Sequence, residues 1–192
     1  FDGNITVMGT HTVTAKAVTP TVTAGVSKTY DRTTAMTGLT LSSSDLVAND
    51  VVAFDGTGQF SQRQVGTGLG YTVSGISLTG ADAGNYSLAS NTFTGSARIT
   101  PRLLSVVGTR VADKTQDGTT QAAVTMGNLL GLIGVETLLA APSASFDTPA
   151  TGGDKAVNVR YSLSDGTNGG LAGNYALPDQ VLRAAILASR TD

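Results

Sequence analysis

The sequence predicts an all-β protein built from β-sandwich modules in tandem, and three observations support this fold class. A six-residue motif, Ala83–Leu88, returns almost unchanged as Ala172–Leu177, and Lys28–Thr34 returns in part as Lys114–Thr120. Short runs alternate between apolar and polar residues, which is the period of a strand with one buried face. Gly accounts for 24 of 192 residues while only 14% are charged, a composition that favours strands and turns over helices.

The N-terminal segment reads as a long strand. Apolar residues between positions 5 and 17 share one parity, and threonines fill the other. The triplet Val18-Thr19-Pro20 ends this run as Ile99-Thr100-Pro101 ends the next repeat. We therefore expect residues 1–19 to be the terminal strand of a preceding module, or a strand donated to another chain.

Two repeats follow, residues 20–101 and 102–192. Alternating runs predict strands in the first repeat at 22–26, 71–78, 86–88 and 92–100, and in the second at 157–163 and 181–188. Gly75 interrupts the apolar parity and predicts a β-bulge, whereas Asp55-Gly56, Gly66–Gly68 and Gly152-Gly153 read as turns. A capped helical turn is expected at 43–48, with its counterpart at 128–133.

The repeated tyrosine has the layout of a tyrosine corner, a feature of immunoglobulin-like sandwiches. Tyr86 begins the penultimate strand, and its hydroxyl is expected to bond to backbone a few residues upstream. Leu88 takes the inward position that a cysteine holds in immunoglobulin domains, and Asn85 tolerates the left-handed backbone of the turn. The matching positions of the second repeat are Asn174, Tyr175 and Leu177. The modules are accordingly predicted to be immunoglobulin-like, with an exposed ligand-binding tyrosine as the alternative.

Composition excludes several classes of partner. A net charge of −2 provides no electrostatic footprint for nucleic acid or an anionic membrane surface. The most apolar stretch, residues 129–141, is too short to span a bilayer, which needs about 20 residues. Cysteine is absent, so disulfides, thiolate metal sites and cysteine nucleophiles are excluded.

The chain resembles a known family. Lys-Thr-Tyr-Asp with Thr-Thr at 28–34, Val-Gly-Thr-Gly at 65–68, Leu-Thr-Gly-Ala-Asp-Ala-Gly-Asn-Tyr-Ser-Leu at 78–88 and Ile-Thr-Pro at 99–101 are similar to the YDG repeat of large bacterial surface adhesins, including filamentous-haemagglutinin-like exoproteins. Arg32 stands where the family has glycine, and Gln116 replaces the tyrosine. Asp31 and Asp117 are therefore expected to serve a tight turn. The resemblance implies an extracellular, cell-surface protein of a Gram-negative bacterium.

Catalytic chemistry is not recognisable in the sequence. The single histidine, His11, has no evident nucleophile or orienting partner, so we expect no enzyme activity and no cofactor. Calcium is the one metal considered, with candidate ligands at Asp31, Asp45, Asp50, Asp55 and Asp82, but the calcium-loop spacing is absent. A Lys28–Asn85 isopeptide bond would require burial of both residues beside a carboxylic acid.

We therefore expect a structural stalk or fibre segment of a surface adhesin. A linker of one or two residues ending at Pro101 predicts modules joined in line, with neighbouring repeats or other copies of the protein as partners. The alternative is an adhesive module that binds glycan or protein through the loops at 55–64 and 147–155. The low aromatic content, 5%, weighs against a glycan site.

Overall fold

The computed structural model describes residues 9–189, which divide into two units. The first unit contains the chain up to Ser27, Thr34–Ser61 and Gly68–Ala97; the second contains Lys28–Thr33, Gln62–Thr67 and the chain from Arg98 onward. Within residues 9–189 the only helices are two single 3-10 turns, so the predicted all-β class is confirmed. Three short pieces of the first sequence repeat, residues 28–33, 62–67 and 98–101, therefore belong structurally to the second unit.

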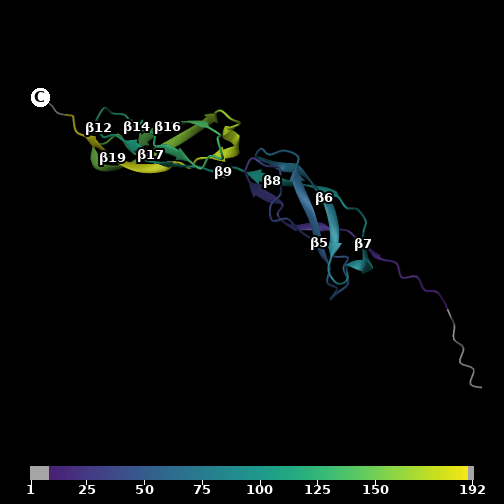
Figure 1. Ribbon diagram of the computed structural model, residues 1–192. Helices are drawn as coiled ribbons and strands as arrows, with labels where there is room; N and C mark the ends of the chain where they lie inside the picture. The colour runs from purple at the N-terminus through teal and green to yellow at the C-terminus, as the bar shows by residue number, and fades with distance from the viewer. Residues whose placement is uncertain (1–8, 190–192) are drawn as a thin grey trace, which may run out of the picture. The chain divides into compact units, whose positions relative to one another are not determined.

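The first repeat is organised around a four-stranded sheet. Its strands are β1 (Lys16–Val18), β2 (Thr21–Ala24), β3 (Ser27–Thr29), β4 (Thr40–Ser42), β5 (Ala53–Phe60), β6 (Gly66–Thr79), β7 (Tyr86–Leu88) and β8 (Phe93–Thr100), with the 3-10 turn η1 (Ala83–Asn85) before β7. The sheet has the order β3-β8-β6-β5, and β1-β7 and β2-β4 form separate two-stranded sheets. The long strands β5 and β6 run side by side (Figure 1).

The second repeat is organised around a five-stranded sheet. Its strands are β9 (Arg102–Leu103), β10 (Ser105–Val107), β11 (Arg110–Val111), β12 (Lys114–Thr115), β13 (Gln121–Ala122), β14 (Val124–Thr125), β15 (Asn128–Leu130), β16 (Leu138–Phe146), β17 (Gly152–Asp165), β18 (Tyr175–Ala176) and β19 (Gln180–Leu187), with η2 (Ala172–Asn174) before β18. The sheet has the order β12-β19-β17-β16-β13. Its three long strands are adjacent in Figure 1.

Both repeats open with the same parallel pairing. Strand β1 pairs with β7, matching Lys16 to Tyr86, and β9 pairs with β18, matching Arg102 to Tyr175. Val18 and Leu104, at or just after the ends of these first strands, are 0% and 3% exposed. The segment Lys16–Val18 thus pairs within the same chain as the opening strand of the first repeat, so this repeat begins before residue 20, the start expected from the sequence.

Alternation along the long strands builds the cores. In β17, Val157 and Val159 are fully buried while their neighbours Asn158 and Arg160 are exposed. The valines pack with Ala122, Phe146, Ala184 and Ile186. In the first unit the buried side chains include Met36, Phe60, Tyr71, Val73, Ile76 and Tyr86. Burial of these side chains, at roughly 25 cal/mol per Å² of apolar surface, is the main stabilising contribution.

The bulge predicted at Gly75 is confirmed. The register of β5 and β6 changes between Asp55, opposite Ser77, and Thr57, opposite Ser74. Gly75 lies in the longer segment with a φ of 64°, in the left-handed region that glycine adopts without steric cost. The extra residue explains the slip in apolar parity.

Two predictions of local structure are wrong. The long strand expected over 5–17 is reduced to Lys16–Val18, because residues 9–15 are exposed and form no strand; residues 1–8 lie outside the described part. Turns replace the helical turn expected at 43–48, and strand β15 occupies the first half of its counterpart at 128–133.

The turns expected at glycine pairs are also wrong. The glycines at 56, 66, 68, 152 and 153 lie inside or at the start of strands. At Gly56 the reason is close packing, because a Cβ there would stand 3.2 Å from the Leu41 side chain. Glycine in a strand can therefore mark the close approach of a neighbour as well as a turn.

Candidate functional site

Each repeat holds its repeated-motif tyrosine against an acidic residue in the same way. In the first repeat, the Tyr86 hydroxyl donates to Asp50 Oδ2 at 2.5 Å and accepts from the Val47 amide at 2.9 Å. In the second, the Tyr175 hydroxyl donates to Glu136 Oε2 and accepts from the Ile133 amide at 3.2 Å. The backbone partner lies in the loop before β5 or β16, not a few residues upstream as expected for a tyrosine corner.

The Glu136 carboxylate gathers further partners from the first repeat. Its Oε1 accepts from the Tyr30 hydroxyl at 2.9 Å and lies 3.0 Å from Arg32 Nε. The rings of Tyr30 and Tyr175 meet edge to face with centroids 5.4 Å apart. Glu136 is 4% exposed and Tyr30 is 1% exposed, so a buried carboxylate is enclosed by two tyrosines and one arginine. We call these four residues the Glu136 cluster.

A second polar contact extends this cluster. Asn174 is 3% exposed, and its Oδ1 accepts from the Val65 amide at 3.0 Å. Tyr30, Arg32 and Val65 all fall in the stretches of the first repeat that belong to the second unit. Among residues 9–189 no buried side-chain nitrogen or oxygen lacks a hydrogen-bond partner, so the cluster satisfies its polar groups internally.

Burial and the carboxylate shape the titration of the tyrosines. Desolvation, followed by the hydrogen bond to Glu136, raises the pKa of Tyr175 from 10.0 to about 12. The same two causes raise the pKa of Tyr30. In the first repeat the hydrogen bond to Asp50 is the main cause that raises the pKa of Tyr86. All three hydroxyls therefore stay protonated donors at neutral pH.

The Tyr-Asp segment of the first repeat forms a tight turn that presents Tyr30. Lys28 Nζ lies 2.6 Å from Asp31 Oδ1 and donates to the Thr33 carbonyl, while the Thr33 amide donates to Asp31 at 2.9 Å. Burial tends to raise the pKa of Asp31, but the hydrogen bonds from Lys28 and Thr33 outweigh it and lower the pKa. Arg32 follows with a φ of 69°.

The second repeat reproduces this turn without the tyrosine. Lys114 Nζ lies 2.7 Å from Asp117 Oδ1, and the Thr119 amide donates to the same oxygen at 2.9 Å. The hydrogen bond from Lys114, followed by those from Thr119, lowers the pKa of Asp117 to about 2. Gly118 has a φ of 77° where the first repeat has Arg32. Asp31 and Asp117 thus both stabilise a turn, whereas Gln116 is exposed.

The remaining residues singled out in the sequence are scattered. Leu88 and Leu177 are half-buried, and Asn85 is exposed whereas Asn174 is buried. Exposure of Asn85 removes the burial that an isopeptide bond to Lys28 requires. His11 is exposed and lies outside any strand.

The aspartates considered as calcium ligands are separately engaged where partners are seen. Asp45 accepts from the Thr19 amide at 2.9 Å, and Asp82 accepts from the Val51 amide at 2.7 Å. Across residues 9–189 no group of three or more acidic or histidine side chains comes together. The geometry of the described residues is that of turns and loop anchors.

A second candidate site is an open depression of about 510 Å³ in the first unit. It is lined by residues of β5, β6 and β8, with Phe60 and Tyr71 at ring centroids 6.4 Å apart. These rings are only 3% and 9% exposed, so they present little face for a sugar to stack on. The Glu136 cluster is the more highly organised of the two sites.

Sequence reasoning missed the acid partners. Glu136 and Asp50 occupy the same place in the two repeats, because the spacing that carries Lys28 to Lys114 also carries Asp50 to Glu136. An aligned acidic position in both repeats was the available signal. This signal is weak because the residue is aspartate in one repeat and glutamate in the other. Both acids also lie far from the tyrosines in the sequence.

Comparison with known families identifies the chain. The family model described as the YDG domain matches residues 14–93 and again residues 100–182. The chain therefore belongs to the YDG domain family and carries two copies of the domain. No curated protein and no solved structure matches it. Within residues 9–189 no helix has the length and apolar character needed to cross a membrane.

Proposed function

We propose that the chain is a structural segment of a bacterial cell-surface adhesin, a stalk or fibre in which YDG domains are repeated as immunoglobulin-like sandwich modules. The Glu136 cluster is the observation that carries this proposal. It binds Tyr30 and Arg32 of the first repeat to Glu136 and Tyr175 of the second within one unit. The best-organised polar site of the described chain therefore serves to hold consecutive repeats to each other.

The chemistry of the cluster supports a structural role. Both oxygens of the Glu136 carboxylate are engaged, and the tyrosine hydroxyls are buried donors with raised pKa values. A general base needs access to a substrate proton, and a nucleophile needs an activating neighbour. An enclosed carboxylate with three partners offers neither. We accordingly propose that the protein is not an enzyme.

The architecture agrees with an array. Each repeat touches mainly its neighbours in repeat proteins, so length is added without a new fold. The resemblance to adhesin repeats supports an extracellular location. The in-line arrangement expected from the short linker at Pro101 stays a prediction, which solution scattering of the intact chain measures directly.

Strand donation is a variant of this proposal. Because Lys16–Val18 already pair with β7, the donated segment would have to lie before Lys16. Deletion of residues 1–15 keeps β1 and should abolish any concentration-dependent filaments formed by the intact chain. Filaments that persist after this deletion would remove the variant.

Mechanical unfolding of the intact chain tests the structural role. When the wild type is pulled from its ends in single-molecule force spectroscopy, the two units should unfold in two separate force peaks. Glu136→Ala should lower the unfolding force of the second unit. A matched variant, Asp179→Ala, removes an exposed ion pair with Arg160 at 3.9 Å and should leave both forces unchanged. Equal forces for Glu136→Ala and the wild type would argue against the proposal.

The alternative is an adhesive module for glycan or protein. The depression beside Phe60 is the observation that favours it, since it includes residues 59–61 of the segment 55–64 expected to bind, although residues 55–60 form part of β5 and not a loop. Specific binding on a glycan or protein array that is lost on replacing Gln59, at the rim of the depression, would establish this function. An array with no signal would leave the structural role as the better account.

A further inference from the structure

The two acid–tyrosine sites differ in how completely the acid and the asparagine are covered, whereas both tyrosines are buried. Glu136 has three side-chain partners, whereas in the described part of the chain Asp50 accepts a side-chain hydrogen bond only from Tyr86. Asn174 is buried and accepts a hydrogen bond from the Val65 amide, whereas its counterpart Asn85 is exposed. The first repeat thus presents the same site without the Tyr-Asp turn that covers it in the second.

We propose that the surface formed by Asp50 and Asn85, beside the buried Tyr86, is a docking site for the Tyr-Asp-Gly turn of another YDG module. The inference rests on the proposed role of the chain as one segment of an array. The occupant is specified by the second repeat, where Tyr30 donates to the acid at 2.9 Å and packs edge to face on the motif tyrosine. An incoming tyrosine would donate its hydroxyl to the second oxygen of Asp50.

The turn beside the acid differs between the two repeats. Arg32 reaches Glu136 beside Gly134, which has a φ of 59°. The residue equivalent to Gly134 in the first repeat is Ala48, but the left-handed residue of that turn is Asn49, with a φ of 75°. The glycine of the incoming turn is therefore taken from the donor segment of the second repeat, where Gly118 follows Asp117.

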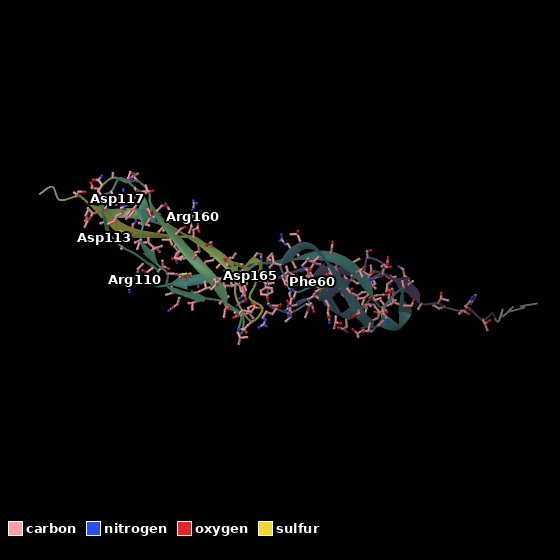
Figure 2. All side chains as sticks on the ribbon, turned by 90° about the horizontal axis from the view of Figure 1, so that it is seen from above. Phe60, Arg110, Asp113, Asp117, Arg160 and Asp165 are labelled. Carbon is pink, nitrogen blue, oxygen red and sulfur yellow. The ribbon has the colours of Figure 1, made fainter. Side chains whose placement is uncertain are left out.

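The donor turn and the receiving acid lie at opposite ends of the second unit. The donor turn lies near the start of β17, because Lys114 pairs with Ile186 and Ile186 is also opposite Gly152. The receiving acid lies near the end of β17, because Asp165 pairs with Leu138, two residues from Glu136. Figure 2 likewise shows Asp113 and Asp117 at one end of this unit and Asp165 at the other. A contact between the donor-turn end of one module and the acid end of another joins two different surfaces, so it is heterologous. Such a contact can be repeated from module to module.

The second repeat carries the Tyr-Asp-Gly turn with one residue different, so a single substitution tests the proposal. The segment Gln116-Asp117-Gly118 keeps the aspartate and the glycine but replaces the tyrosine. Gln116→Tyr restores the triplet, and because Gln116 is exposed the substitution leaves the core intact. Analytical ultracentrifugation of the full chain should show self-association at least about tenfold tighter than that of the wild type, the effect expected of one added charge-assisted hydrogen bond.

Two controls identify the contact. Gln116→Phe supplies the ring without the hydroxyl, and Gln116→Tyr combined with Asp50→Ala removes the acceptor, so both should associate like the wild type. Hydrogen exchange should slow at the Val47 amide only in the associating variant.

A mixing experiment gives an independent readout. The chain with Gln116→Tyr and Asp50→Ala can donate but not receive, so with the wild type it should form a one-to-one complex and nothing larger. Absence of this complex, or association of Gln116→Tyr that survives the loss of Asp50, would overturn the docking proposal. Either result leaves the structural role intact, because force measurements on the single chain test that role.

Discussion

Replacement of Glu136 by alanine is the perturbation for which the structure gives the clearest magnitude. The substitution removes the acceptor of two tyrosine hydroxyls, from Tyr30 and Tyr175, residues that are 1% and 5% exposed. Each hydrogen bond to a charged group contributes about 1.5–3 kcal/mol. Arg32, with a side chain 33% exposed, regains water at little cost. The free energy of unfolding of the second unit should therefore fall by about 3–5 kcal/mol, the range seen when a buried ion pair loses one partner.

The assay is urea denaturation of the full chain followed by circular dichroism and tyrosine fluorescence. Two transitions are expected where the units differ in stability, so each is fitted separately. The matched control is Asp50→Ala in the first repeat, which removes one tyrosine hydrogen bond to a half-buried carboxylate and should cost less, about 1.5–3 kcal/mol. A Glu136→Ala chain within about 0.5 kcal/mol of the wild type would refute the argument that this carboxylate organises the cluster.

Three further outcomes follow from the fold. Because the pKa of Tyr175 is raised from 10.0 to about 12, its stabilisation is complete below pH 10 and is lost as the pH rises through 12; melting temperatures from pH 9 to 12 should fall more steeply for the wild type than for Tyr175→Phe. Gly75→Ala forces alanine to a φ of 64° in open space, so urea midpoints should report a loss of about 1–2 kcal/mol, and an unchanged midpoint would contradict the bulge geometry. Gly170→Ala would drive its Cβ into the Thr137 carbonyl oxygen and should cost about 3 kcal/mol, whereas Gly173→Ala meets nothing and should melt like the wild type.

Period-two patterning identified the β class and most of the long strands. It predicted the bulge at Gly75, because a glycine that shifts the apolar parity supplies both the extra residue and the left-handed backbone that a bulge uses. It failed over residues 9–15, where alternation is present but no partner strand pairs with it. Alternation reports what a strand could bury, and only tertiary pairing decides whether the strand forms.

The sequence predicted the tyrosines of the candidate site but not their acid partners. The repeated motif drew attention to Tyr86 and Tyr175, but a hydroxyl's partner depends on which loop folds beside it. Asp50 and Glu136 sit in the loops before β5 and β16, far from the tyrosines in sequence. The contribution of Tyr30 to Glu136 spans 106 positions, which no local pattern reports.

The parallel pairing of β1 with β7 sets the order in which a repeat can be completed. Lys16 pairs with Tyr86, and Arg102 pairs with Tyr175. The opening strand of each repeat therefore cannot pair until the strand that carries the motif tyrosine has been synthesised. Contacts this distant along the chain slow folding, because the intervening loop must close first. A growing polypeptide would thus leave Val18 and Leu104 without their full cover until nearly an entire repeat has emerged, which makes closure a late, cooperative step rather than a gradual one.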